Sequence, residues 1–161
     1  MTELRTTLDA HERRLQQYML QQGMDTEHLC FQDSCHSVTE AADTAGCAPQ
    51  ELVKNVCLVA ADAQIIVAIV RGTDRVSTTR VGKALGMERP RTATPAEILD
   101  ATGYPCGGTP SFGYQAIFLV DPKVMEVSTV YSGGGSTRAL VRVGTESLLA
   151  DNGGRVVRIR R

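Results

Sequence analysis

Two Val- and Ile-rich runs of strand length lie only three residues apart near the middle of the chain. They span Leu52 to Ala60 and Gln64 to Arg71, and the link Ala61-Asp62-Ala63 separates them. So short a link predicts a β-hairpin, because parallel strands need a crossover of a dozen or more residues. Most of the other strand-like runs also follow one another without long helices between them, which disfavours a doubly wound parallel sheet. The pattern predicts an α/β (α+β) fold whose sheet is mixed and mostly antiparallel.

Capping residues and apolar spacing predict the remaining elements. Thr94, Pro95 and Glu97 form a strong helix start, with a cap, a proline at the first helical position and an acid at the third. Ser37 and Glu40 have the spacing of a capping box. We expect helices over about 3–22, 37–45, 78–85, 94–102 and 145–149, a helical turn at 49, an extended piece at 28–32, and strands over 115–120, 124–131, 138–143 and 155–161.

Length and composition narrow the class of protein. The chain has 161 residues and 42% hydrophobic content, which predicts a single globular domain over 1–161. The longest apolar run, Ile65 to Val70, is too short to span a membrane, and the charged N-terminus has no secretory signal, so we expect a cytoplasmic protein. A net charge of −1 argues against a general DNA-binding protein.

The five cysteines do not suggest a metal site. They are odd in number and no pair has CxxC spacing, which predicts reduced, mostly packed thiols. We therefore expect no metal and no cofactor.

Lys54 is the most informative single residue, because it lies inside an apolar strand. Side chains alternate along a strand, so Lys54 shares a face with Leu52, Val56 and Leu58. Either the side chain reaches out to water, as lysines commonly do, or it is a cation held in a partly dry site that binds an anion or a carbonyl.

Two glycine-rich segments are the next candidates. The loop from Cys106 to Tyr114 lacks the Gly-Lys-Ser/Thr of a phosphate-binding P-loop and the Gly-x-Ser-x-Gly of a nucleophile elbow. The turn from Ser132 to Ser136 could expose several N–H donors. Taken alone, each segment is more often a plain turn than a binding loop.

Two further features are open to two interpretations. His36, with Ser37 and Thr39 beside it, is either solvated or at the rim of a site. The basic C-terminal end either contacts a phosphate backbone or is the solvated face of a last strand. Its members are Arg155, Arg158, Arg160 and Arg161.

These features occur in one order that resembles the YbaK/ProX family, the editing domains associated with prolyl-tRNA synthetase. The resemblance covers nearly the whole chain from about Gln32. The matching segments are 36–42 (HSVTEAA), 53–56 (VKNV), 67–75 (VAIVRGTDR), 81–86 (VGKALG), 103–113 (GYPCGGTPSFG) and 130–135 (VYSGGG). Each segment alone is unspecific, but the ordered set is fairly specific.

The resemblance implies a fold, an activity and a site. Members have a mixed sheet, partly closed like a barrel and surrounded by short helices. They are aminoacyl-tRNA deacylases, which hydrolyse the ester of a mischarged tRNA, often tRNA for proline. By analogy, Lys54, Gly107 and Gly108 would be catalytic. The substrate-binding residues would be His36, Thr39, Thr109, Pro110, Ser111, Phe112, Gly113, Ser132, Gly133 and Gly134.

An activated ester needs positioning and modest charge stabilisation, so no metal is required. The expected partners are a tRNA acceptor end with its amino acid and, further, prolyl-tRNA synthetase.

Two positions depart from the family pattern. Ser111 stands where a proline is common, and Thr137 and Arg138 stand where the cysteine-removing branch has an acidic residue. The second departure disfavours cysteine as the substrate. Two hypotheses follow: a free-standing trans-editing deacylase that removes a small wrong amino acid such as Ala, Ser or Cys, or a non-catalytic module that binds tRNA or a protein partner with the same pocket.

Overall fold

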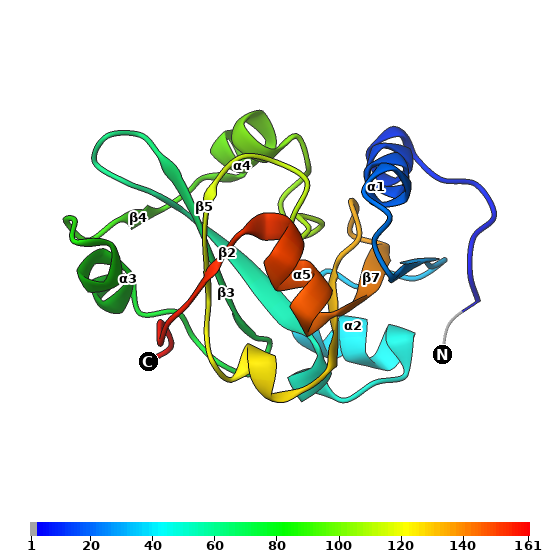
Figure 1. Ribbon diagram of the computed structural model, residues 1–161. Coiled ribbons are helices and arrows are strands. Elements are labelled where there is room, and N and C mark those ends of the chain that lie inside the picture. Colours follow the sequence, from blue (N-terminus) through cyan, green and yellow to red (C-terminus); the bar gives the residue numbers. More distant parts are fainter. Residues whose placement is uncertain (1–2) are drawn as a thin grey trace.

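The computed structural model describes residues 3–161, whose helices surround two β-sheets (Figure 1). The helices are α1 (Ala10–Gln21), α2 (Val38–Ala45), α3 (Thr78–Leu85), α4 (Pro95–Thr102) and α5 (Thr145–Asn152), with the 3-10 turns η1 (Pro49–Glu51) and η2 (Val124–Glu126). The strands are β1 (Thr26–Cys30), β2 (Val53–Val59), β3 (Ile65–Arg71), β4 (Arg91–Thr92), β5 (Ile117–Val120), β6 (Thr129–Gly133), β7 (Ala139–Gly144) and β8 (Arg155–Val156).

One sheet is antiparallel and the other is mixed. The smaller sheet has the strand order β1-β7-β6 and is antiparallel throughout, and the larger sheet has the order β4-β2-β3-β5-β8. In the larger sheet the β2–β3 and β2–β4 pairs are antiparallel, whereas β3–β5 and β5–β8 are parallel. A bridge between Leu52 and Tyr131 joins the two sheets next to the start of β2. This confirms the predicted mixed, mostly antiparallel, partly barrel-like architecture.

The β2–β3 hairpin is buried on both faces. Val53 and Cys57 belong to the core that α1 and α5 help to close, while Leu58 and Val70 belong to the core under α3 and the C-terminal segment. A strand covered on both sides gains free energy from apolar side chains at every position, which explains the nearly continuous Val and Ile runs. Lys54 and Asn55 are the polar interruptions of that pattern.

Local capping rules placed most helices correctly. Ser37, Ser77 and Thr94 each accept a hydrogen bond from the backbone N–H three residues on, and α4 starts with the full capping box and Pro95. Left-handed glycines end α2, α3 and α4, at Gly46, Gly86 and Gly103. The side-chain acceptors and the left-handed glycines satisfy backbone groups that have no partner inside the helix.

The prediction of a helix over about 3–22 is wrong at its N-terminal boundary. Asp9 caps the helix and forms a capping box with Glu12, so α1 begins at Ala10. Upstream, Leu4 instead bridges to Phe31, and the Arg5 N–H donates to the Cys30 carbonyl. The spacing of the leucines near the N-terminus is that of a helix, but the pairing of Leu4 with Phe31 keeps this segment out of α1.

Three other boundaries also differ. The predicted strand 124–131 opens instead as η2 and becomes β6 only at Thr129. The last helix starts at Thr145 as predicted but continues to Asn152, three residues beyond the predicted end. The predicted strand 155–161 is reduced to β8, because β8 pairs with β5 only at Leu119 and Val120, where β5 ends. Within residues 3–161, no helix is long and apolar enough to cross a membrane.

Candidate functional site

A cavity of about 200 Å³ opens beside the unpaired part of β2. On that edge of the strand β4 pairs only with Leu58 and Val59, so Val53, Lys54 and Asn55 are left to line the cavity. The opposite walls come from α2 and the segment before it, from α4, from the 106–109 loop and from the two smaller-sheet strands β6 and β7. The other lining residues are Cys35, His36, Ser37, Val38, Ala41, Leu52, Ile98, Cys106, Gly107, Thr109, Gly133 and Leu140.

Lys54 is the only residue of this described lining with a full charge when histidine is neutral. The side chain is half-buried, and no carboxylate among the described residues lies within ion-pair distance of it. Burial and the neighbouring positive charge of Arg75 lower the pKa of Lys54, and Asp74 acts in the opposite direction. A cation without a partner at a concave wall is suited to a ligand oxygen that carries or develops negative charge.

Asn55 organises a buried polar network under the cavity floor. The Ser111 hydroxyl donates to Asn55 Oδ1 at 2.6 Å and lies 2.7 Å from the Ser132 hydroxyl. Asn55 Nδ2 donates to the Thr109 carbonyl at 2.9 Å and to Ser132 Oγ at 3.2 Å. The network ties β2, the 106–113 loop and β6 to one another, and the Ser111 and Ser132 side chains are fully buried.

Replacing Asn55 by leucine should destabilise the fold, because the Thr109 carbonyl would lose its donor in a dry site. A buried polar group left unsatisfied costs about 1–3 kcal/mol. Urea unfolding of Asn55→Leu measures this loss, and Thr73→Ala, on an exposed loop residue, is the control. An unfolding midpoint equal to that of the unchanged protein would show that the network contributes nothing.

Close backbone contacts explain the glycines of the two loops. Gly107 has φ +87°, and a Cβ there would lie 2.5 Å from His36 Nδ1. A Cβ on Gly133 would overlap the Thr109 carbonyl oxygen. The Gly135 N–H donates to the Gly108 carbonyl at 2.8 Å, so the two loops are also bonded directly. Side chains at these positions would separate the loops and change the shape of the cavity.

Helix α1 supports the glycine-rich turn from behind. The Ser136 hydroxyl donates to Glu12 Oε2 at 2.7 Å, and Arg5 makes a two-pronged ion pair with the same fully buried carboxylate. Burial disfavours the ionised carboxylate, but hydrogen bonds from Arg5, the Asp9 N–H and Ser136 outweigh it and lower the Glu12 pKa to about 2. Glu12 therefore holds the turn with a charge that is present throughout the neutral range.

The structure brings together only some of the predicted site residues. Lys54, Gly107, Thr109, Gly133 and His36 line the cavity. The others lie behind it or away from it. Gly108, Ser111 and Ser132 are in the supporting layer, and Pro110 and Phe112 are buried. The Gly134 carbonyl is hydrogen-bonded to His28 Nε2, and Gly113 lies beside Tyr18, which a Cβ at that position would contact. Thr39 is exposed on α2 outside the lining.

Two residues with clear structural roles were missed from the sequence. Asn55 lies in the 53–56 segment VKNV, and no role was inferred for it from the sequence. Asparagine is unfavourable in strands, so its presence in an apolar strand already indicated a special role. Glu12 looked like an ordinary helix residue, but Asp9 three positions earlier signalled the capping box that places it.

The buried thiols of Cys35 and Cys57 do not act as anions at neutral pH. Burial raises the pKa of Cys35 to about 12 and that of Cys57 to about 11. All five cysteines are free, as predicted, and Cys106 is the exposed one. Within residues 3–161, no three His, Cys, Asp or Glu side chains form a group that could hold a metal ion.

Comparisons with known proteins identify the family of this chain. The model of the aminoacyl-tRNA editing domain matches residues 32–150. A solved structure described as a candidate trans-editing enzyme for prolyl-tRNA synthetase superposes with a TM-score of 0.89 at 26% identity, covering 96% of this chain and 99% of that one.

Two curated sequences also match. The proline–tRNA ligase of Acidithiobacillus ferrooxidans is 35% identical over 71 residues, which are 44% of this chain and 12% of the ligase. The uncharacterised protein YwhH of Bacillus subtilis is 23% identical over 120 residues, covering 73% of this chain and 76% of that protein. The chain belongs to the aminoacyl-tRNA editing domain family, the YbaK/ProX group associated with prolyl-tRNA synthetase.

Proposed function

We propose that this protein is a trans-editing deacylase that hydrolyses the ester of mischarged tRNA, with tRNA for proline carrying a small wrong amino acid as the substrate. The observation that carries the proposal is the lone Lys54 cation in a small, otherwise neutral cavity. The proposal treats residues 1–161 as one editing domain that acts in the cytoplasm, with prolyl-tRNA synthetase as a further partner.

The reaction adds water across the ester bond. The water oxygen bonds to the acyl carbon, the ester bond breaks, and the ribose oxygen leaves with a proton. Negative charge develops on the carbonyl oxygen on the way, and the Lys54 ammonium is the group placed to stabilise it. Gly107 lets the substrate approach the loop backbone, since no side chain intervenes.

The cavity size favours a small amino acid. Its volume of about 200 Å³ is below the roughly 300–1,000 Å³ of sites for drug-sized ligands. The wall is largely aliphatic, from Val38, Ala41, Leu52 and Leu140, and offers no carboxylate. These features suit the aminoacyl group of Ala, Ser or Cys, with the tRNA itself outside.

A deacylation assay tests the proposal directly. The protein is given tRNA for proline charged separately with Ala, Cys, Ser and Pro, and Ala and Ser on their own tRNAs. Selective release from a mischarged species is expected. Release from none of them, with tRNA still bound, would support a non-catalytic binding module, and neither release nor binding would leave only the fold in common with the family.

Val38→Ala should shift the choice of amino acid towards a larger side chain. Val38 is half-buried on the first turn of α2 and lines the cavity, so the smaller residue adds space with little cost in stability. One methylene is worth about 10–200-fold in discrimination, and we expect the kcat/KM ratio of Pro-tRNA to Ala-tRNA to rise by about tenfold. Thr39→Ala, a neighbour on α2 outside the lining, is the matched control. An unchanged ratio in Val38→Ala would place the amino acid elsewhere.

A further inference from the structure

Positive charge is concentrated at one end of the molecule, although the whole chain has a net charge of −1. Residues 71–91 and 155–161 are distant in sequence, yet they hold ten of the seventeen Lys and Arg residues and only two of the eighteen Asp and Glu residues. The cations are Arg71, Arg75, Arg80, Lys83, Arg89, Arg91, Arg155, Arg158, Arg160 and Arg161, and the acids are Asp74 and Glu88.

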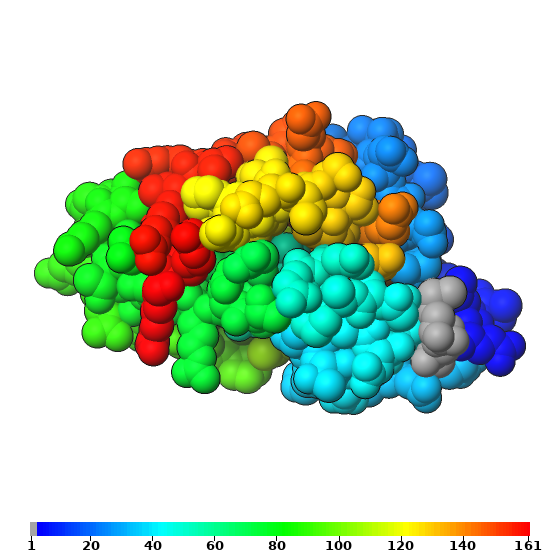
Figure 2. All heavy atoms as spheres, turned by 90° about the horizontal axis from the view of Figure 1, so that it is seen from below, coloured from blue at the N-terminus to red at the C-terminus, as the bar shows by residue number. Residues whose placement is uncertain are grey.

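The fold places the two segments side by side. The Arg161 N–H donates to the Arg75 carbonyl at 2.8 Å, and the Ser77 N–H donates to the Ile159 carbonyl at 2.7 Å. Ile159 is fully buried in the same core as Val81 of α3. Figure 2 shows the C-terminal residues in red alongside the green part of the chain around residue 80. The charges therefore form one surface.

Some of these arginines already have partners inside the protein. Asp121 is fully buried, and its carboxylate accepts from the Ile159 and Arg160 N–H groups and from Arg160 Nη1. Arg71 pairs with Asp74, and Arg155 donates to the Ala84 carbonyl at the end of α3. The Asp121 contacts fix the course of the last residues.

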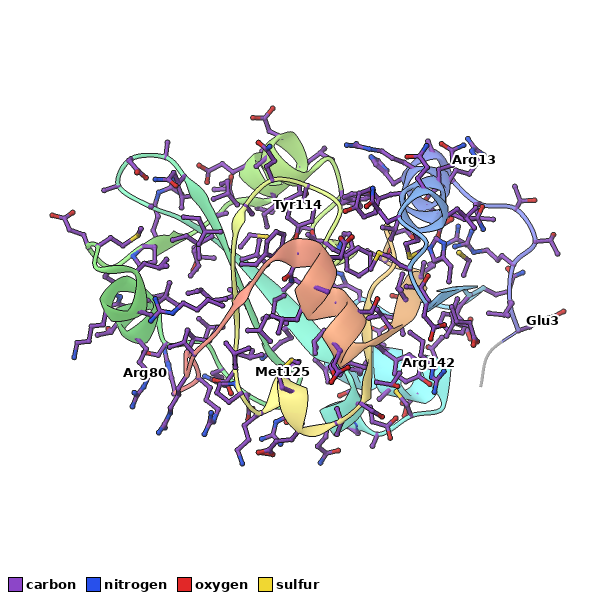
Figure 3. All side chains as sticks on the ribbon, viewed as in Figure 1. Glu3, Arg13, Arg80, Tyr114, Met125 and Arg142 are labelled. Atoms are coloured by element: carbon purple, nitrogen blue, oxygen red, sulfur yellow. The ribbon has the colours of Figure 1, made fainter. Side chains whose placement is uncertain are left out.

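Arg91 also pairs with Glu97, and Arg89 donates to the Thr78 hydroxyl. The other five cations have no such partner. Arg75, Arg80, Lys83, Arg158 and Arg161 are exposed and make no ion pair with a described residue; we call these five residues the basic ridge. Arg80 and Lys83 are three residues apart on α3 and so share a helix face. Figure 3 shows Arg80 and neighbouring nitrogen-tipped side chains pointing away from the body of the protein, below α3 and the C-terminal segment.

One end of the ridge lies near the cavity. Lys54 lines the cavity and pairs across the β2–β3 hairpin with Val70, at the end of β3 from which the chain runs on to Arg75. The Arg75 carbonyl in turn accepts from the Arg161 N–H. A ligand whose reacting end sits at Lys54 would meet these cations as it extends beyond the cavity. A partner that carries many phosphates, such as a nucleic-acid double helix, suits a group of exposed cations of this kind.

We propose that the basic ridge binds the phosphate backbone of the tRNA acceptor stem while the aminoacylated end occupies the cavity. This inference rests on the proposed function for its choice of RNA. The ridge binds without reading sequence, because it offers cations to phosphates and no group placed to read a base. The ridge therefore extends the proposed tRNA-binding site beyond the residues that line the cavity.

The test compares Arg75→Gln/Arg158→Gln/Arg161→Gln with the control Arg13→Gln/Arg142→Gln, which removes exposed arginines from α1 and β7 (Figure 3). Binding of uncharged tRNA for proline is measured by fluorescence anisotropy over a series of salt concentrations. Each phosphate contact contributes about 0.9 to the slope of log K against log salt, so the ridge variant should lose about 2–3 from the slope and about tenfold in affinity. The control should match the unchanged protein.

Hydrolysis gives a second readout that separates the two proposals. Alanylated tRNA is compared with an alanylated CCA trinucleotide, which has no stem, and the ridge variant should lower the kcat/KM ratio of the two by about tenfold. If the ridge variant keeps the tRNA affinity and the salt slope of the unchanged protein, the ridge does not bind tRNA, even if hydrolysis is intact. Equal competition by duplex DNA and tRNA would overturn its assignment to RNA. If the protein hydrolyses none of these substrates, the proposed function is wrong, and the binding measurements still test whether the ridge binds tRNA.

The single variant Arg158→Gln keeps the test decisive if the triple variant folds poorly. Arg158 is exposed, and its side chain makes no recorded hydrogen bond among residues 3–161, so the variant should fold normally. It should lose about 1 from the salt slope.

Discussion

Lys54→Ala is expected to lower kcat/KM for the deacylation of mischarged tRNA by about 100- to 1,000-fold, the cost of removing one group that stabilises a developing oxyanion. The cavity offers no second cation to take its place, since Lys54 is the only charged side chain of the described lining. Steady-state release of the amino acid from alanylated tRNA for proline measures the loss. Lys54→Arg should recover part of the activity, because the charge is kept while its position and spread change.

The same substitution should leave the fold intact or make it more stable. Lys54 is half-buried without a carboxylate in ion-pair range among the described residues, and it lies near the like charge of Arg75. Such a group opposes folding, and it is retained where function needs it. Thermal unfolding of Lys54→Ala should therefore give a Tm equal to or above that of the unchanged protein.

Lys123→Ala is the matched control for this prediction. It removes a surface lysine that pairs with Glu126 and does not line the cavity, and it should change neither activity nor Tm by a measurable amount. Full deacylase activity in Lys54→Ala would remove Lys54 from the mechanism. A large fall in Tm would instead show that Lys54 is a structural residue.

The sequence predicted best those elements whose causes are local. The β2–β3 hairpin follows from two apolar runs and a short link, and α4 follows from Thr94, Pro95 and Glu97 within one turn. The start of α1 was misjudged because Leu4 pairs with Phe31, a contact that spacing within the helix cannot reveal. The short β8 likewise depends on where β5 ends.

The site was predictable only in part for the same reason. Lys54 stood out as a charge in an apolar strand, and the glycine-rich loops stood out by composition. Which loop residue faces the cavity depends on how the chain turns: Thr109 lines it, whereas Ser111, two positions on, points to Asn55. That distinction is set by hydrogen bonds between β2, the loop and β6, which lie far apart in sequence.

The second large effect is expected at Glu12, outside the cavity. Glu12→Ala should destabilise the fold by about 3–5 kcal/mol, the cost of removing one partner from a buried ion pair and leaving the other without compensation. Arg5 would lose both of its carboxylate contacts, and the Asp9 N–H and Ser136 hydroxyl would lose an acceptor. Urea unfolding measures the change, with the exposed Glu27→Gln as the control.

A double-mutant cycle shows whether this loss belongs to the pair. Arg5→Ala should also be strongly destabilising, and the double variant should cost less than the sum of the two single variants, because the second substitution removes a group that is already unpaired. Additive costs would mean that Arg5 and Glu12 act independently, contrary to the two-pronged contact between them.

The Glu12 contacts also predict how stability depends on pH. The carboxyl has a pKa of about 2 in the folded protein, below its ordinary value of 4.5, so the unfolded chain binds a proton that the folded one does not. The stabilisation is complete above about pH 5–6 and decreases as the pH falls through 4.5 towards 2. Between pH 6 and pH 3 the unchanged protein should therefore lose more stability than Glu12→Gln, which has no carboxyl to protonate.

Because Ser136 connects Glu12 to the glycine-rich turn, the same loss should reach the site. Glu12→Gln keeps the size of the side chain but weakens the hold on Ser136, and Gly135 is in turn bonded to Gly108. We expect kcat to fall while tRNA affinity, which the proposed basic ridge supplies, stays unchanged. Full kcat in a folded Glu12→Gln would show that α1 stabilises the protein without positioning the loops that close the cavity.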